Sequence, residues 1–415
     1  MKKVFVIIDQ PERDLSSLMY IFSNLLKLDK YRIIFFSKDN LPNLELDYFK
    51  NSILICNYFR KSIFHYLSYL FYFKKTEIVI YDTEGVGGKD GYAILPQIIK
   101  LKNYLNMINE YWLWGINLEK KLRKNLKFKN FYSVGCPRLD PSYLKLFKKK
   151  MEKNILVTTN FPTLNPKYSK GVRHEFKEIK KLDDNANIKV IQELENQRNL
   201  FVKYLKETIK IFKSEKFIIR PHPFENLDFW ISEFRNYKNV NIKNDIDIFS
   251  ELKNSKIVIH RNDTCAIEAK FINIKSLSIN WILGKNDFKI PIYVSKRSKN
   301  FEEFKKNILL LLKNKKYKSN IQKIQKFYIN PKKRNTITNV NHRIMNIKTK
   351  KREFNLDKIF LLIRFFLSKI SNFLNKKKSK KLINSGMIKK EINKLNLQNL
   401  KIQKNKNFFY EIKYK

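Results

Sequence analysis

Apolar residues in the first third of the chain recur in two alternating patterns. Short β-branched and aromatic runs, typical of buried strands, occur at 4–8, 32–36, 53–56, 77–81, 111–114 and 131–134. Helix-like stretches separate them, including 15–28 and the aromatic segment 63–73, for which a core helix is favoured over a lipid-facing one. This alternation is typical of βαβ units and predicts a mostly parallel sheet. No Gly-x-Gly-x-x-Gly motif follows the first run, so a dinucleotide site is not indicated.

A second alternating set begins after a lysine-rich connection at 143–153. Its expected strands are 154–158, 216–220, 239–242 and 256–260, with helices at 200–212 and 301–312. The polar stretch 165–196 is expected to be an insertion that forms a mobile flap. We therefore predict two α/β domains, at 1–150 and 151–330, followed by a tail at 331–415.

The tail has a different pattern. Projection of 355–375 at about 100° per residue gives an apolar stripe that Leu361 and Phe365 interrupt and that consists of Ile359, Leu362, Ile363, Phe366, Leu367, Ile370, Phe373 and Leu374. A lysine run follows at 376–381. This basic helical tail is typical of an interfacial helix held by anionic lipid over 355–381, and the alternative is a helix that packs on the N-terminal domain. Residues after Gly386 are expected to be weakly ordered.

The chain is strongly basic. Its 415 residues include 86 Lys and Arg against 38 Asp and Glu, which gives a formal net charge of +48. Such a charge suggests nucleic acid as a partner, but no helix-turn-helix, zinc-finger spacing or aromatic RNA-binding signature is present. The excess is mainly lysine, with abundant Asn and Ile and only 9 Gly, a composition that an AT-rich coding sequence also produces. We therefore expect anionic lipid or a nucleotide-activated substrate rather than nucleic acid.

Cysteine usage and hydropathy indicate the compartment. Cys56, Cys136 and Cys265 are far apart and form no metal-type pair, which fits a reducing cytosol. The N-terminal apolar run is short and meets Asp9 at once, so we expect a strand rather than a secretion signal. No uninterrupted apolar segment is long enough to span a bilayer. The expected location is the cytoplasm, peripheral on the inner face of the cytoplasmic membrane.

A proline-bracketed histidine ends the strand expected at 216–220. Arg220 precedes Pro221-His222-Pro223, and Glu225 follows. In open α/β sheets, ligands bind outside the carboxyl ends of the strands, so these three side chains are expected at a site. A rigid backbone would direct His222 towards a phosphate. The alternative is a structural turn whose histidine is only hydrogen-bonded.

The strand expected at 256–260 leads through a polar turn into a helix. Thr264 would lie near the helix N-terminus, where free N–H groups and the helix dipole favour an anion. Glu268 is one turn further along the same face and could reach a ribose hydroxyl. The alternative is an exposed glutamate in the first helical turn.

Two carboxylates follow the strand expected at 77–81. Asp82 and Glu84 precede Gly85, whose backbone allows a turn and close approach to a ligand, so either acid is a candidate general base. The alternative is that one of them caps the next helix.

Pro137 stops a later strand and directs Arg138 from the rim, although Arg138 could equally pair with Asp140.

The order of these motifs resembles the family of bacterial surface carbohydrate biosynthesis proteins, which are glycosyltransferases of GT-B architecture. The resemblance covers about residues 1–320 and rests on many short motifs in order. These are Asp82-Thr-Glu84-Gly85, Trp114-Gly115, Gly135-Cys-Pro137-Arg138-Leu-Asp140, Thr159-Asn160-Phe161, Arg220-Pro-His222-Pro, and Ile259-His260 with Thr264 and Ile267-Glu268-Ala269. Asn160 and His260 enter the candidate donor site through this resemblance alone.

The acid-Gly and His-Pro elements are similar to those of GT-B sialyltransferases and Kdo transferases. The resemblance implies two Rossmann-like domains facing a cleft, Glu84 as base and His222 on the donor phosphate. This chain departs from the family pattern at Thr83, where a second acid is usual, and at Thr264-Cys265, where two hydroxyl residues are usual.

We therefore expect a metal-independent glycosyltransferase of surface polysaccharide biosynthesis, with no cofactor. The donor would be a nucleotide sugar, a CMP-linked ulosonic acid being one candidate, and the acceptor a glycan or lipid-linked glycan. Arg220, His222, Thr264, Glu268, His260 and Asn160 would bind the donor, and Arg138 and Gly85 would lie on the acceptor side. The alternatives are a CDP-alcohol polyol-phosphate transferase, which also carries a His-Pro element, and a non-catalytic basic scaffold that binds lipid or nucleic acid.

Overall fold

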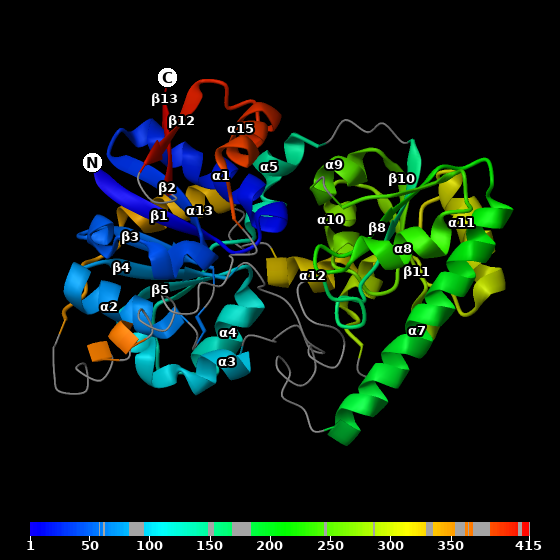
Figure 1. Ribbon diagram of the computed structural model, residues 1–415, viewed down its shortest axis with the longest axis horizontal. Coiled ribbons are helices and arrows are strands. Elements are labelled where there is room, and N and C mark those ends of the chain that lie inside the picture. The colour runs from blue at the N-terminus through cyan, green and yellow to red at the C-terminus, as the bar shows by residue number, and fades with distance from the viewer. Residues whose placement is uncertain are drawn as a thin grey trace. The chain divides into compact units, whose positions relative to one another are not determined.

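A computed structural model of the chain describes residues 1–57, 59–60, 63–82, 95–147, 153–167, 184–244, 247–284, 287–328, 335–352, 362–363, 365–367, 382–405 and 409–414. The chain divides into two compact units (Figure 1). Unit 1 contains Met1–Tyr143 and Gln325–Lys415, and unit 2 contains Leu144–Ile324. Unit 2 is therefore one continuous segment, whereas unit 1 is built from both ends of the chain.

Unit 1 contains an eight-stranded sheet in the order β12-β13-β2-β1-β3-β4-β5-β6. The six strands from β2 to β6 in this order are mutually parallel, as the hydrophobic runs predict. Their bounds are β1 Lys2–Ile8, β2 Tyr31–Ser37, β3 Ile53–Cys56, β4 Glu77–Tyr81, β5 Ile108–Leu113 and β6 Phe131–Ser133. Strands β1 to β4 each have at most two polar residues. Helices cover both faces of a parallel sheet, so its strands are apolar on both sides.

The helices of unit 1 pack their apolar faces on this sheet. The segment predicted as one helix at 15–28 is three consecutive helical pieces, a π-helical turn at Pro11–Leu15, α1 at Ser16–Ser23 and a 3₁₀ segment at Asn24–Leu28. The aromatic helix α2, Phe64–Lys74, is a core helix for most of its length, with Leu67 and Leu70 fully buried. The remaining helices of this part of the chain are α3 Leu95–Lys100, α4 Ile116–Asn125 and α5 Pro141–Lys145.

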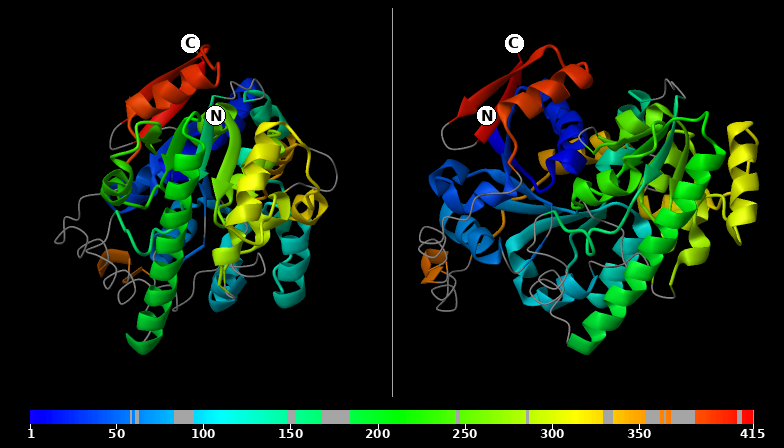
Figure 2. Two further views of the ribbon diagram at one scale, coloured as in Figure 1. Left: turned by 90° about the vertical axis from the view of Figure 1, so that its right-hand side faces the viewer. Right: turned by 45° about the vertical axis from the view of Figure 1, so that its right-hand side comes forward.

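The last residues of the chain complete the first sheet. β13, Phe409–Tyr414, pairs antiparallel with β2, and β12, Leu400–Asn405, pairs with β13. The hairpin and helix α15, Ser385–Lys394, lie beside the N-terminal strand in both views of Figure 2. The prediction that residues after Gly386 are weakly ordered is therefore wrong. The prediction rested on the local composition, whose lysines and asparagines are typical of disordered segments. The strand that orders this segment, β2, is far away in the sequence.

Two buried contacts fix β13 in place. The Glu411 carboxylate is fully buried and accepts two hydrogen bonds from Arg32 of β2, each 2.7 Å long. Phe409 is also buried, and its ring lies 5.5 Å from that of Phe5 and 5.6 Å from that of Phe36. The C-terminal hairpin thus contributes both an ion pair and an aromatic ring to the core of unit 1.

Residues 335–352 cross the same unit as a strap. Helix α13, Thr336–Met345, lies against Gly135, which has a φ of +105°; a β-carbon there would lie 2.5 Å from Thr336 Oγ1. Further along, Arg343 donates to both oxygens of Glu110, and Arg352 forms an ion pair with Glu77 at 2.7 Å. Glu77 and Glu110, which lie on β4 and β5, therefore anchor the strap through charge.

Unit 2 contains a five-stranded parallel sheet in the order β11-β10-β7-β8-β9. The bounds are β7 Asn154–Thr158, β8 Phe217–Arg220, β9 Val240–Ile242, β10 Ser255–His260 and β11 Lys275–Ser278. Numbered from β7, the order is 3-2-1-4-5, the arrangement of a Rossmann fold, and the chain changes direction across the sheet between β7 and β10. The carboxyl ends of β7 and β10 therefore flank the point at which such folds bind ligands.

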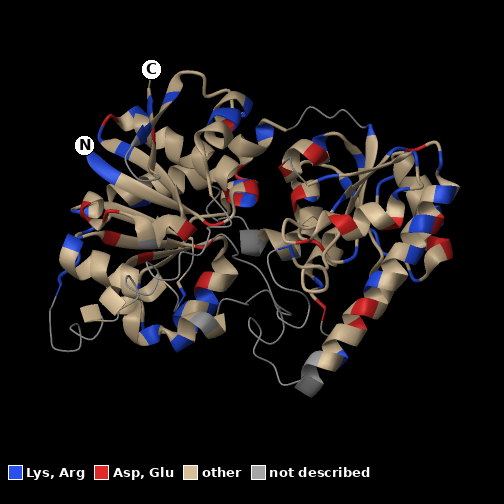
Figure 3. Ribbon diagram, in the orientation of Figure 1, with Lys and Arg blue, Asp and Glu red and all other residues tan. Residues whose placement is uncertain are grey.

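The polar stretch expected as a flap is in part a long helix. α7 runs from Asp184 to Ile211, so the helix predicted at 200–212 begins sixteen residues earlier. Acidic and basic residues are interspersed along it (Figure 3), so the segment lacks a strong hydrophobic period. The remaining predicted residues, 168–183, lie outside the described part of the chain.

The other helices of unit 2 follow the pattern more closely. The closing helix α11 has the predicted bounds, Phe301–Leu312. The remaining helices are α8 Leu227–Phe234, α9 Ile248–Lys253 and α10 Cys265–Phe271 in unit 2, and α12 Ile321–Tyr328 where the chain passes back to unit 1. None of the helices among the described residues combines the length and hydrophobicity needed to cross a bilayer.

Phe409→Ala tests whether the C-terminal hairpin is part of the core. Removing a buried ring is expected to lower the free energy of unfolding by about 3–5 kcal/mol. Urea denaturation followed by circular dichroism measures the change. Lys404→Ala is the matched control, because Lys404 lies on the exposed part of the same hairpin. Equal stability of both variants would contradict a structural role for the hairpin.

Candidate functional site

Arg220 occupies the carboxyl end of β8 with an unused donor. The side chain is only 6% exposed, and Nη1 has no hydrogen-bond partner within the described ranges. Asn244 follows the adjoining strand β9, and its Nδ2 is likewise buried without a partner there. A buried donor without an acceptor is costly, so two of them at one sheet edge indicate a place for a ligand rich in acceptor oxygens.

The His222 ring is oriented by its own loop. The backbone N–H of Phe224 donates to Nδ1 at 3.2 Å, so in the neutral ring the proton is on Nε2. The ring is half-buried. His222 lies two residues after Arg220, and in the neutral ring its Nε2 is the donor.

Glu225 holds this loop against the rest of the unit. Its carboxylate is fully buried and accepts from Thr159 Oγ1 at 2.8 Å, from the N–H of Phe161 at 2.9 Å, from the N–H of His222 at 3.2 Å and from Trp230 Nε1 at 2.8 Å. The expectation that Glu225 stands open at the site is thus wrong. It joins the end of β7, the His222 loop and helix α8.

The environment of Glu225 has opposing effects on its charge. Burial raises the pKa of Glu225 above the usual value, while the four donors lower it and only partly compensate. Hydrogen bonds to an ionised oxygen are stronger than those to a neutral one. Since all four partners are donors, the ionised form is the one that this geometry satisfies best.

A buried arginine at the neighbouring strand end was not singled out from the sequence. Arg261 follows β10, is 4% exposed, and stacks over the ring of Phe161 at 4.6 Å. It donates to Gln197 of α7 and to the backbone oxygen of Asn160, and Asp287 lies 3.7 Å away. Burial lowers the pKa of Arg261, and the nearby acids oppose this effect. Its position directly after His260, at the end of an expected strand, could have indicated Arg261 as a site residue.

Asn160 belongs to the same polar cluster. Its Nδ2 donates to Asn262 Oδ1 at 3.3 Å, and Asn262 in turn donates to Asp287 at 3.3 Å. The ends of β7 and β10 are therefore tied together by amides across the switch point of the sheet. Asn160 is half-buried, which leaves it accessible from this edge.

His260 has a structural environment. It is fully buried, Nε2 lies 2.7 Å from Ser295 Oγ, and Nδ1 accepts from the N–H of Asp263 at 3.2 Å. Burial lowers the pKa of His260 to about 4, and the charge of Asp263 opposes the shift. This geometry supports a neutral histidine that positions the turn after β10. It does not support a direct contact between His260 and a nucleotide-sugar donor.

The two remaining donor-side candidates lie on the turn into α10. Thr264 is half-buried at the helix N-cap and makes no side-chain capping bond, while the helix itself has only seven residues. Glu268 is 5% exposed, which rules out the exposed-glutamate alternative. Cys265 is buried, with Sγ 3.0 Å from Thr158 Oγ1, so it packs on the sheet instead of facing a ligand.

Asp82 is buried at the carboxyl end of β4 in unit 1. Tyr111 donates to its carboxylate at 3.5 Å, and Trp114 Nε1 donates to its backbone oxygen. Burial raises the pKa of Tyr111, and the charge of Asp82 adds to the shift. Glu84 and Gly85 lie outside the described residues.

Other polar side chains follow the neighbouring strand ends of unit 1. Asp9 follows β1 and pairs with Lys38 at 2.5 Å. Asn57 follows β3, and its Nδ2 is buried with no partner among the residues described. Arg138 is half-buried, with its guanidinium 5.5 Å from the centre of the Trp114 ring. These groups form a polar edge at which hydroxyl oxygens could be bound.

Asp140 has a different role from the pairing considered for it. It is fully buried, and its carboxylate accepts from the backbone N–H groups of Ser142 at 2.8 Å and Ile337 at 3.2 Å. It therefore caps α5 and holds the strap.

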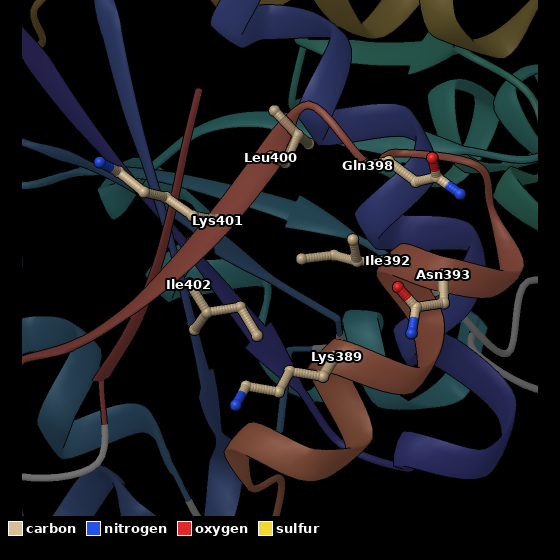
Figure 4. A pocket seen from close by; sticks show the side chains of 7 residues that line it. All are labelled: Lys389, Ile392, Asn393, Gln398, Leu400, Lys401 and Ile402. Carbon is tan, nitrogen blue, oxygen red and sulfur yellow. The ribbon is translucent and has the colours of Figure 1, made fainter. Parts of the chain in front are cut away.

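A surface hollow of 490 Å³ lies between α15 and β12 (Figure 4). Its lining has aliphatic, amide and ammonium groups but no acid or histidine, and consists of Lys389, Ile392, Asn393, Gln398, Leu400, Lys401 and Ile402. Within the described ranges, no cluster of three His, Cys, Asp or Glu side chains suited to a metal ion is present.

Comparison with known proteins supports the fold. No protein-family model matches the chain, and no curated protein matches its sequence. S. aureus MnaA, solved with UDP, is 13% identical over 86% of this chain and 100% of MnaA, with a TM-score of 0.51. The UDP-GlcNAc 2-epimerase from Methanocaldococcus jannaschii is 14% identical over 84% of this chain and 100% of its own, with a TM-score of 0.49. The predicted α/β fold class, with two Rossmann-like units of GT-B type, is confirmed.

His260 gives a pH-dependent prediction. An unfolded histidine titrates near 6.5, so as the pH falls from 6.5 towards 4 the unfolded chain takes up a proton that the folded chain excludes. Because of His260, the free energy of unfolding should fall by about 2 kcal/mol when the pH is lowered from ~7 to ~4.5. Urea unfolding at both pH values should show that loss in the wild type and not in His260→Gln. His342→Gln, which alters an exposed histidine, should behave like the wild type, and an unchanged pH slope in His260→Gln would refute the assignment.

Proposed function

We propose that the chain is a metal-independent glycosyltransferase that moves a sugar from a nucleotide donor to an acceptor hydroxyl in surface polysaccharide synthesis. The observation that carries the proposal is the Nη1 of Arg220, which is buried without a partner in the described part of the chain, two residues before His222. A buried guanidinium and an imidazole at the carboxyl edge of a Rossmann sheet suit the phosphates of a nucleotide. Asn244 on the next strand adds a third donor.

The reaction would need one carboxylate and a stabilised leaving group. Glu84, or Asp82 in its place, takes the proton of the acceptor hydroxyl, whose oxygen forms a bond to the anomeric carbon of the donor. The bond between that carbon and the phosphate oxygen breaks, and the electron pair leaves with the nucleotide. Arg220 and His222 neutralise the charge that grows on the phosphate, which is electrostatic stabilisation without a covalent intermediate. The proposal requires the acid of unit 1 to approach a donor held by unit 2.

The choice of nucleotide is open to direct measurement. MnaA, whose fold this chain shares, was solved with UDP, so UDP is a first probe beside CMP and CDP. Titration calorimetry with the three nucleotides, followed by product analysis with the matching sugars, separates the candidates. Release of the nucleotide with transfer of the sugar supports the proposal. Transfer of a polyol phosphate from a CDP-alcohol, or conversion of the sugar while it stays on the nucleotide, would replace it.

Variants of the phosphate-binding pair are expected to lose nucleotide affinity. Arg220→Met and His222→Ala should each weaken binding by about 10- to 100-fold, because a hydrogen bond to a charged group is worth about 1.5–3 kcal/mol. Arg220→Met should leave the melting temperature nearly unchanged, since Nη1 has no partner to lose in the described structure. His342→Ala is the control. Wild-type affinity in both site variants would refute the assignment.

The catalytic carboxylate is tested by isosteric substitution. Glu84→Gln is expected to lower kcat by about 10²- to 10⁴-fold, the usual contribution of general base catalysis, with little change in nucleotide affinity. Asp82→Asn is the matched comparison. A large effect confined to Asp82→Asn would assign the base to Asp82, and full turnover in both variants would leave the proposed mechanism without its base.

A further inference from the structure

A short helical piece of the tail is anchored on helix α2 by one aromatic ring. Phe365 is 3% exposed and stacks on Tyr69, with ring centres 4.1 Å apart and planes within 11°. It also meets the edge of the Tyr66 ring at 5.6 Å. Phe365 belongs to the hydrophobic cluster of unit 1, so this contact fixes which side of the helical piece faces inward.

Three residues of the apolar stripe predicted from the sequence face outward instead. Ile363 is 48% exposed, Phe366 52% and Leu367 60%. These positions have the i, i+3, i+4 spacing of one helix face, whereas Phe365 is one of the two residues that interrupt that stripe. The residue that breaks the pattern therefore serves as the anchor, and these three residues of the stripe are turned towards solvent.

A neighbouring ring extends this surface. Phe73 of α2 is 39% exposed and stacks on Tyr69 at 5.3 Å, the same ring that holds Phe365. We call Phe73, Ile363, Phe366 and Leu367 the apolar patch. Beside it lies a hollow of 340 Å³ lined by Leu44, Leu46, Asp47, Tyr69, Lys74, Phe365 and Phe366. Burying four such side chains in water-free surroundings would be strongly favourable, so their exposure indicates a partner.

We propose that the apolar patch docks on the surface of an anionic lipid bilayer. The argument for this occupant is charge. The chain carries a net charge of +48, and a run of five lysines at 376–381 follows the stripe in the sequence. Lysines near an anionic leaflet strengthen binding, while apolar side chains enter the acyl boundary. A second copy of so basic a chain would be repelled by the same charge.

The docking surface adds a partner to the proposed transferase and does not depend on its chemistry. A membrane-bound enzyme would find a lipid-linked acceptor in the plane of the bilayer. Binding to vesicles needs no donor, so it is measured separately from nucleotide affinity, and either property can fail without the other.

Sedimentation with vesicles tests the patch on the full-length chain. The probes are phosphatidylcholine vesicles with and without phosphatidylglycerol. The wild type should bind the anionic vesicles, with weaker binding as NaCl is added. The double variant Phe366→Ser/Leu367→Ser should lower the partition coefficient by about 100-fold, because two large apolar side chains no longer enter the membrane.

A matched control comes from the other unit. Leu309→Ser/Leu310→Ser removes two adjacent apolar side chains that are 50% and 44% exposed on α11, and it should bind vesicles like the wild type. Melting temperatures of all three proteins check that each is folded. Undiminished vesicle binding by Phe366→Ser/Leu367→Ser would overturn the proposal. A patch variant that changes only the oligomeric state in gel filtration would also overturn it, in favour of a second copy as the occupant.

Discussion

The buried carboxylate of Glu225 is the contact on which the candidate donor site depends. Its four hydrogen bonds come from the end of β7, the loop after β8 and helix α8, and they add to the backbone pairing of β7 with β8. An uncompensated carboxylate in a dry interior would be very unfavourable, so each donor has to stay in place. This requirement holds the His222 loop against the end of β7 and helix α8.

The two units use charge in different ways. In unit 2, Arg261 and its amide neighbours connect strand ends around the switch point, so the polar groups lie where a ligand would bind. In unit 1, the buried acids Glu77, Glu110 and Glu411 each meet an arginine from another part of the chain. Those ion pairs hold the strap and the C-terminal hairpin in place. These three buried acids therefore have a structural role.

The hydrophobic pattern predicted most strands of both sheets because a buried parallel strand is a short, continuous apolar run. The same logic failed for β12 and β13, where polar residues interrupt the apolar ones and where β2, the partner of β13, lies far away in the sequence. The Pro-His-Pro sequence correctly predicted where β8 ends. The role of Glu225 could not be predicted, since it depends on Thr159 and Trp230 being close in space.

The discontinuity of unit 1 has a consequence for biosynthesis. During translation, the continuous segment 144–324 is synthesised before the strap and the final hairpin. Unit 2 can therefore fold while unit 1 still lacks β13. Until then, the edge of β2 and the rings of Phe5 and Phe36 lack their last neighbour. The pairing of β13 is therefore a late step in the folding of unit 1, and a chain that lacks β13 would leave that edge and those rings uncovered.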